Sequence, residues 1–138
     1  MKIVVIDGQG GKMGKAIVEQ LKLRFPSQEI YGIGTNSLAT SAMLKAGADY
    51  AATGENPVKV NSDNADIIVG PIGIIVPNAL VGEISPAMAA AIGSSNAKKI
   101  LIPVTRCQLW IAGVQEYSLS EYIRLAIQEI ENQLHTLY

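Results

Sequence analysis

A run of glycines near the amino terminus is the part of the sequence best suited to bind a ligand. It reads Gly8-Gln9-Gly10-Gly11-Lys12-Met13-Gly14. The run lies between an apolar β-branched segment and a segment with helical periodicity. Glycines in this context let backbone N–H groups approach a phosphate, and the amino end of the helix adds positive dipole. These seven residues are therefore predicted to bind a nucleotide or dinucleotide; the alternative is a purely structural turn.

The glycine spacing departs from the usual G-x-G-x-x-G fingerprint. Gly8 and Gly10 match its first pair, but Gly14 comes one residue late. In the reading Gly8-x-x-Gly11-x-x-Gly14, Gly8 allows a tight turn, Gly10 or Gly11 brings N–H groups near phosphate, and Gly14 lets helix and strand pack closely. The substitution Gly11→Asp is expected to abolish nucleotide binding and leave the protein folded.

This spacing resembles the variant found in dihydrodipicolinate reductases and their relatives, over the start of the chain only. Those reductases carry a basic residue near the cofactor at the position of Lys12, so the resemblance implies that Lys12 contacts the cofactor. A lysine in a first helical turn opposes the helix dipole, and a bound anion would offset that effect. The alternative is a solvated surface lysine.

A second resemblance extends over the whole chain. The segments that carry it are Val5–Gly11, Ile33–Asn36, Ala52–Asn56, Val69–Gly73 and Ile102–Cys107. Together they resemble an uncharacterised family of short bacterial Rossmann-like proteins that is labelled a domain of unknown function. The resemblance implies a Rossmann-like fold and a bacterial source, and it implies no activity.

The acid that usually ends the second strand of a dinucleotide site is absent. That position reads Thr35-Asn36-Ser37. These groups could bind a ribose or a 2′-phosphate, or Asn36 and Ser37 could simply cap the next helix. The predicted cofactor is NAD or NADP, and a mononucleotide stays open.

Other candidates follow the remaining strands, at the edge where ligands of open α/β sheets bind. They are Gly70, Pro71 and Arg106, and Arg106 could clamp a phosphate or form a surface salt bridge. Asp7 is interpreted as a group that pins the glycine turn, with Mg²⁺ binding as the alternative. Glu83 could reach the cleft, be solvated or act as a cap.

No catalytic set and no metal site is predicted. The single histidine, His135, lies near the carboxyl end, and Cys107 is interpreted as a small buried apolar residue. One cysteine and one histidine cannot make a closed zinc site.

The elements that position these residues alternate between strands and helices. Strands are predicted over 3–6, 29–34, 49–53, 66–70 and 99–104, with a possible sixth over 108–113. Helices are predicted over 12–24, 37–46, 86–93 and 119–137, capped in the last three cases by Ser37, Ser85 and Ser118, while 54–65 is predicted as a crossover without a full helix. The alternation predicts one α/β domain over 1–138 with a mostly parallel, doubly wound, Rossmann-like sheet of five to six strands.

Composition narrows the classes of function. The 138 residues are 49% hydrophobic and 17% charged, with a net charge of -1. These values are untypical of a disordered chain or a nucleic-acid binder, and no apolar run reaches a membrane span. One cysteine and the absence of a leader predict a cytoplasmic protein.

Two functional classes remain. The favoured one is a binding or sensor module without turnover, because there is no room for a substrate domain and no evident acid–base pair. The alternative is a small NAD(P)-dependent oxidoreductase whose site is completed across an oligomer interface. An apolar stripe from Leu119 to Leu137, preceded by Trp110 and Ile111, predicts a homodimer through this region; the alternative is a helix packed within its own domain.

Overall fold

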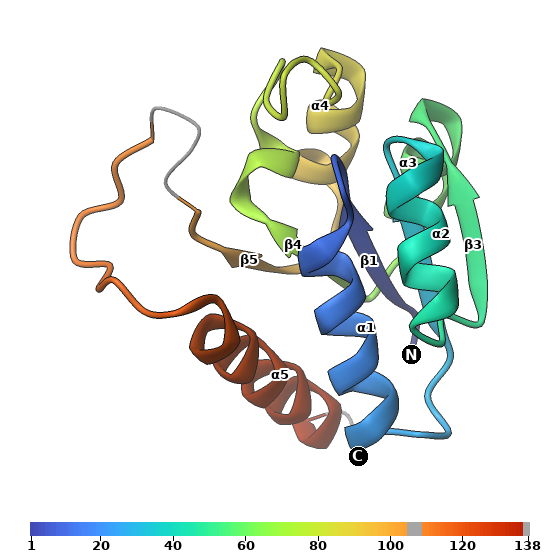
Figure 1. Ribbon diagram of the computed structural model, residues 1–138, viewed down its shortest axis with the longest axis vertical. Helices are drawn as coiled ribbons and strands as arrows, with labels where there is room; N and C mark the ends of the chain where they lie inside the picture. Colours follow the sequence, from blue (N-terminus) through green and yellow to red (C-terminus); the bar gives the residue numbers. More distant parts are fainter. Residues whose placement is uncertain (105–108, 137–138) are drawn as a thin grey trace.

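The computed structural model describes residues 1–104 and 109–136, which form a parallel β-sheet covered by helices on both faces (Figure 1). The strands are β1 (Ile3–Asp7), β2 (Ile30–Gly34), β3 (Tyr50–Thr53), β4 (Ile67–Pro71) and β5 (Lys98–Ile102). Their order in this five-stranded sheet is β3-β2-β1-β4-β5. This is the order of a doubly wound sheet, so the fold class predicted from the sequence is confirmed.

The helices divide between the two faces of the sheet. They are α1 (Lys12–Arg24), α2 (Ser37–Lys45), α3 (Glu55–Asp63), α4 (Pro86–Ser94) and α5 (Leu119–Thr136), with a short 3-10 helix, η1, over Ile72–Ile75. Buried side chains of α1, α2 and α5 share one apolar cluster with the sheet. Those of α3, η1 and α4 share the other cluster, on the opposite face.

Strand β1 shows why the first apolar run is continuous. Ile3 and Val5 belong to the cluster beneath α1, α2 and α5, whereas Val4 and Ile6 belong to the cluster beneath α3 and α4. Alternate side chains of a strand point to opposite faces, so a central strand covered on both sides needs apolar residues at each position.

The order in which strands are added to the sheet reverses at β1. The chain first adds β2 and β3 on one side of β1 and then crosses to add β4 and β5 on the other. The carboxyl ends of β1 and β4 therefore flank a topological switch point, where ligands of open α/β sheets bind. The glycine run follows β1 at this point.

The crossover before β4 differs from the prediction, because residues 55–63 form helix α3. Pro57 lies in the first turn, where the N–H that proline lacks has no partner within the helix. Only Val58 and Ser62 of this helix are buried, which leaves too few apolar positions to show a helical period.

The predicted sixth strand is wrong for the part that the structure describes. Residues 109–113 form no strand, and a turn closes there through the Val114 N–H, which donates to the Ile111 carbonyl at 3.3 Å. Gly113 has a φ of 82°, a left-handed conformation that is incompatible with an extended strand.

The helix caps were predicted correctly in two of three cases. Ser85 Oγ accepts the Met88 N–H at 3.1 Å, and Ser118 Oγ accepts the Glu121 N–H at 3.2 Å. At α2 the cap is Asn36, one of the two capping residues that the sequence offered, and not Ser37, which was assigned to this helix. Both residue types are good caps, so the local sequence does not decide between them.

Gly14 sets the distance between α1 and β1. A Cβ atom there would lie 2.8 Å from Asp7 Cβ and 2.8 Å from Met43 Sδ. We predict that Gly14→Ala lowers the free energy of unfolding by about 1–3 kcal/mol, because the helix must move off the strand. The matched control is Gly93→Ala in α4, where a Cβ meets nothing within 4 Å. Urea denaturation measures both variants, and equal stabilities would contradict this role for Gly14.

Candidate functional site

The glycine loop, residues 8–14, makes a tight turn between β1 and α1. The Gly11 N–H donates to the Gly8 carbonyl at 3.0 Å. Two residues of the loop adopt left-handed backbone conformations: Gln9, with a φ of 50°, and Gly11, with a φ of 75°. The turn therefore requires positive φ at Gln9 and Gly11, whereas Gly8 takes part through its carbonyl and has no positive φ.

Three glycines of the loop are needed for a different reason, which is space. A Cβ at Gly8 would lie 2.5 Å from Thr35 Oγ1, and one at Gly11 would lie 2.8 Å from Ala39 Cα. Gly14 is equally close to β1, as described above, whereas a Cβ at Gly10 would meet nothing within 4 Å. The packing thus requires glycine at every third position, and Gly10 is left facing open space.

The packing at Gly11 makes Gly11→Asp unsuitable as a test of phosphate binding. A side chain at Gly11 would meet the α2 backbone while holding a left-handed conformation. The expectation that Gly11→Asp leaves the fold intact is therefore wrong, since that variant perturbs packing and charge together. Gly10 is the position where a charge can be added alone.

Asp7 holds the loop from within the domain. Its side chain is almost fully buried; Oδ1 accepts the Gly8 N–H at 2.8 Å and Oδ2 accepts the Gly14 N–H at 2.6 Å. Burial raises the pKa of Asp7, these two hydrogen bonds lower it, and the negative charge of Glu83 raises it further. The net shift of the pKa is upward. The structure agrees with the interpretation that Asp7 pins the turn.

The amino end of α1 has backbone donors that find no acceptor within the helix. Its N-cap, Gly11, makes no side-chain hydrogen bond, and its first turn holds no acidic residue. The N–H groups of Gly14 and Lys15 are used by Asp7 and the Gly11 carbonyl. Those of Lys12 and Met13 have no acceptor within the helix, because helix geometry provides none at these positions. The Lys12 side chain is exposed beside them.

Glu83 lies against the loop on the side of β2. Its Oε1 accepts the Gln9 N–H at 2.7 Å and the Thr35 hydroxyl at 3.1 Å. Its Oε2 accepts the Asn36 side-chain amide at 2.8 Å. Sequence reasoning placed Glu83 near the cleft but did not include it among the ligand contacts. The available signal was an acid in a loop at the carboxyl edge of the sheet.

Thr35 and Asn36 join the loop from the end of β2. The Thr35 N–H donates to the Asp7 carbonyl at 3.0 Å. The Asn36 amide also donates to the Gln9 carbonyl at 3.0 Å, while its Oδ1 accepts the Ala39 N–H at 2.9 Å. Asn36 thus caps α2, as one alternative from the sequence had it, and it also contacts the glycine loop. Its binding of a ribose or 2′-phosphate stays a prediction.

The remaining candidates divide by position. Gly70 and Pro71 are buried at the end of β4, and a Cβ at Gly70 would lie 2.2 Å from the Ile6 carbonyl oxygen. Gly70 therefore allows β4 to approach β1 at the base of the switch point. Arg106 and Cys107 lie outside the described residues.

His135 lies far from the glycine loop. It is in the last turn of α5, and Glu131 of the preceding turn pairs with Arg24 at the far end of α1. Within the part of the chain that the structure describes, no cluster of three His, Cys, Asp or Glu residues could hold a metal. The same residues include no helix that is both long and apolar enough to span a bilayer.

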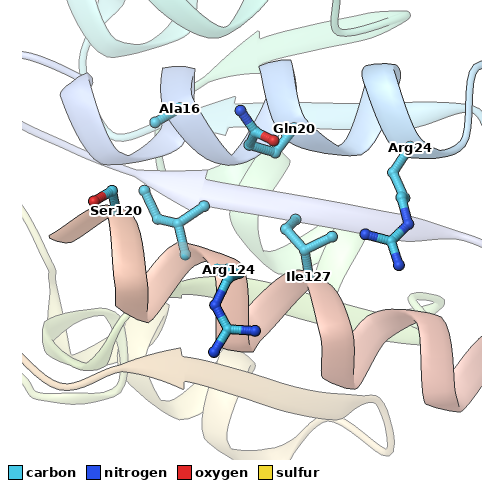
Figure 2. A pocket seen from close by; sticks show the side chains of 7 residues that line it. Ala16, Gln20, Arg24, Ser120, Arg124 and Ile127 are labelled. Carbon is cyan, nitrogen blue, oxygen red and sulfur yellow. The ribbon is translucent and has the colours of Figure 1, made fainter. Parts of the chain in front are cut away.

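A groove of about 270 Å³ lies elsewhere, between α1 and α5. Its lining includes Gln20 and Arg24 of α1 and Ser120 and Arg124 of α5. In Figure 2 the Arg24 side chain reaches from α1 toward α5, whereas the Arg124 side chain extends away from α1. Arg24 pairs with Glu131, and Arg124 pairs with Glu121 at 2.6 Å. Since each arginine is neutralised by a neighbouring carboxylate, the groove is a weaker anion site than the glycine loop.

These features define a doubly wound α/β protein with a glycine loop at its switch point. The chain belongs to the family described as a domain of unknown function, DUF3842, whose family model matches residues 2–135. This finding confirms the likeness to an uncharacterised family, whereas the likeness to dihydrodipicolinate reductases and the bacterial source stay predictions. No curated protein and no solved structure matches the chain.

The buried Asp7 carboxylate gives a prediction about stability and pH. Asp7→Asn leaves one of the two N–H groups without an acceptor, so we expect the free energy of unfolding at pH 7 to fall by about 1–3 kcal/mol. Because the folded pKa of Asp7 is raised, its favourable contribution is complete below the ordinary value of 3.8 and is lost as pH rises through the folded pKa. The stability difference between wild type and variant should therefore widen on acidification. Urea denaturation between about pH 4 and pH 8 measures it, and a difference that narrows would contradict the raised pKa.

Proposed function

We propose that this protein is a binding or sensor module for a nucleotide or dinucleotide, held by the glycine loop at the switch point. One observation carries the proposal. At the amino end of α1 Asp7 accepts the Gly14 N–H, the Lys12 and Met13 N–H groups have no acceptor within the helix, and the adjacent Gly10 faces open space. Backbone N–H groups and helix dipole together favour an anion at such a place, and a phosphate is the anion that nucleotides supply.

The residues present fit the phosphates of NAD or NADP. The N–H groups of Lys12 and Met13 would donate to a phosphate oxygen, and the Lys12 ammonium would add a charge-assisted contact. Thr35 and Asn36 face the loop from β2, on the side where the fold class binds the ribose. A cofactor bound in this way would supply the adenine nucleotide that the module senses.

The polar groups around the loop favour binding over turnover. Asp7 is buried and accepts two N–H groups, and Glu83 is bonded to Gln9, Thr35 and Asn36. The single histidine of the chain, His135, lies in the last turn of α5, which packs near the carboxyl end of α1, far from the loop. A general acid or base near the loop is therefore not evident among the described residues. An oxidoreductase would need such a group from a second subunit, and hydride transfer from NAD(P)H to test carbonyls distinguishes the two classes.

The decisive test adds a negative charge at Gly10. We predict that wild type binds at least one of NAD, NADP and ATP, and that Gly10→Asp weakens binding about tenfold or more through repulsion of the phosphate. Gly10→Asn is the matched control, since it has nearly the same shape without the charge, and its affinity should stay within about threefold of wild type. Calorimetric titration measures all three proteins. Absence of binding by wild type, or equal binding by Gly10→Asp, would overturn the proposal.

We also propose that the protein is a homodimer, through the segment that precedes α5. The stripe on α5 packs inside the domain, because Ile123, Ile127 and Ile130 are buried in the cluster with α1. Exposed apolar side chains also occur singly elsewhere, but several gather in the segment before α5: Trp110 is 92% exposed, and Val114 and Tyr117 are exposed as well. Figure 1 shows this segment running outside the layers of the domain. Exposed apolar groups gathered on one segment mark a contact surface, and twofold pairing is its commonest use.

Light scattering tests the dimer. We predict twice the chain mass of 14.6 kDa for wild type at micromolar concentration. Trp110→Ser should shift the mass toward the monomer, whereas Val81→Ser, at an equally exposed residue in another loop, should not. A monomeric mass at every concentration would refute the dimer and, with it, the site shared between subunits.

A further inference from the structure

We infer that Glu83 recognises the ribose of the ligand and selects nucleotides with free 2′- and 3′-hydroxyls, such as NAD and ADP, over those with a 2′-phosphate. The inference rests on the proposed function and names the class of ligand for the same site. It is carried by the position of the carboxylate, its unused hydrogen-bonding capacity and the absence of a neighbouring base among the described residues.

The position of Glu83 corresponds to that of an acid missing from β2. Dinucleotide sites usually place a carboxylate at the end of the second strand, where it accepts the ribose hydroxyls. Here β2 ends at Gly34 and is followed by Thr35 and Asn36, whose side chains both donate to the Glu83 carboxylate, at 3.1 and 2.8 Å. The loop after β4 thus brings a carboxylate to the place where β2 lacks one.

Glu83 leaves the phosphate donors free. Among the described residues, its only backbone donor is the Gln9 N–H, at 2.7 Å, on the β2 side of the loop. The N–H groups of Lys12 and Met13 lie at the start of α1, and Gly10 between them and Gln9 faces open space. A phosphate would therefore bind at the start of α1 and a ribose at Glu83. The two subsites are adjacent but separate, as the phosphate and the ribose of one nucleotide are.

The carboxylate can still accept a hydroxyl. Two carboxylate oxygens offer about four lone-pair sites. Oε1 accepts two donors, from Gln9 and Thr35, and Oε2 accepts one, from Asn36. Oε2 therefore keeps a site for a ribose O–H, and the hydrogen bond to a charged acceptor is stronger than one to a neutral acceptor.

The surrounding charge opposes a 2′-phosphate. Among the described residues, no lysine or arginine lies within 4.0 Å of the Glu83 carboxylate. Asp7 adds a second carboxylate close enough that the charge of Glu83 raises the pKa of Asp7. A 2′-phosphate at Glu83 would meet negative charge, and no described lysine or arginine lies within 4.0 Å of that carboxylate to offset it, so NADP should bind less well than NAD.

The backbone before Glu83 holds it in place. Asn78, Leu80 and Val81 adopt positive φ angles of 66°, 57° and 57°, which are unfavourable for residues other than glycine. Two hydrogen bonds close the loop, from the Glu83 N–H to the Leu80 carbonyl at 3.1 Å and from the Asn78 N–H to the Ile84 carbonyl at 2.7 Å. Strained backbone of this kind persists where surrounding structure fixes it and is frequent at binding sites.

The experiment compares ligands and variants by calorimetric titration. Wild type is expected to bind NAD about tenfold or more tightly than NADP, and ADP about tenfold more tightly than 2′-deoxy-ADP. Glu83→Gln removes the charge with little change of shape, so NAD should bind about tenfold more weakly and the preference over NADP should fall to within about threefold. Glu55→Gln is the matched control, because Glu55 is an exposed acid that accepts the Ser85 hydroxyl of the same connection at 2.6 Å. That control should bind as wild type does.

The outcomes separate this inference from the proposed function. Binding of none of the four ligands by wild type refutes the nucleotide site itself. Equal binding of NAD and NADP, or of ADP and 2′-deoxy-ADP, refutes only the role of Glu83. This comparison uses wild type alone and so does not depend on the folding of a variant. Tighter binding of both dinucleotides by Glu83→Gln would show that the carboxylate occupies the ligand's place, and an equal loss for both would show a structural role; either result overturns the inference.

Discussion

The buried carboxylate of Asp7 is the group on which the geometry of the crevice depends. It ends β1, accepts the N–H groups of Gly8 and Gly14, and so fixes both ends of the glycine loop. Its carbonyl accepts the Thr35 N–H, which ties the end of β2 to the same point. Because a buried acceptor group is expensive to leave unpaired, these contacts hold together as a unit. The orientation of the outward N–H groups at the start of α1 follows from them.

The crevice is electrically asymmetric. At the start of α1 there are two N–H groups without an acceptor in the helix and an exposed lysine, Lys12, so this side attracts negative charge. On the β2 side there are the carboxylates of Glu83 and, beneath the loop, Asp7. A ligand with a phosphate at one end and uncharged hydroxyls at the other matches both sides in one orientation only. The asymmetry therefore supplies direction as well as affinity.

The sequence predicts local features well and long-range contacts poorly. The glycine loop, α1 and the caps Ser85 and Ser118 were predictable, because turn chemistry and periodicity act within a few residues. Helix α3 was not, since only Val58 and Ser62 of it are buried. The role of Glu83 could not be read either, because its partner Gln9 is 74 residues away along the chain. That contact exists only once β1 and β4 pair.

The neutral end of β2 and the acidic loop after β4 are best understood together. A carboxylate at position 35 or 36 would stand within hydrogen-bonding distance of the Glu83 carboxylate, and like charges that close repel strongly in a half-buried place. Thr35 and Asn36 instead donate hydrogen bonds to it. An acid at position 35 or 36 and Glu83 would thus repel each other, so this part of the crevice favours a single carboxylate. On this argument, the acid that usually follows the second strand is absent because Glu83, from the loop after β4, supplies the carboxylate at the same place.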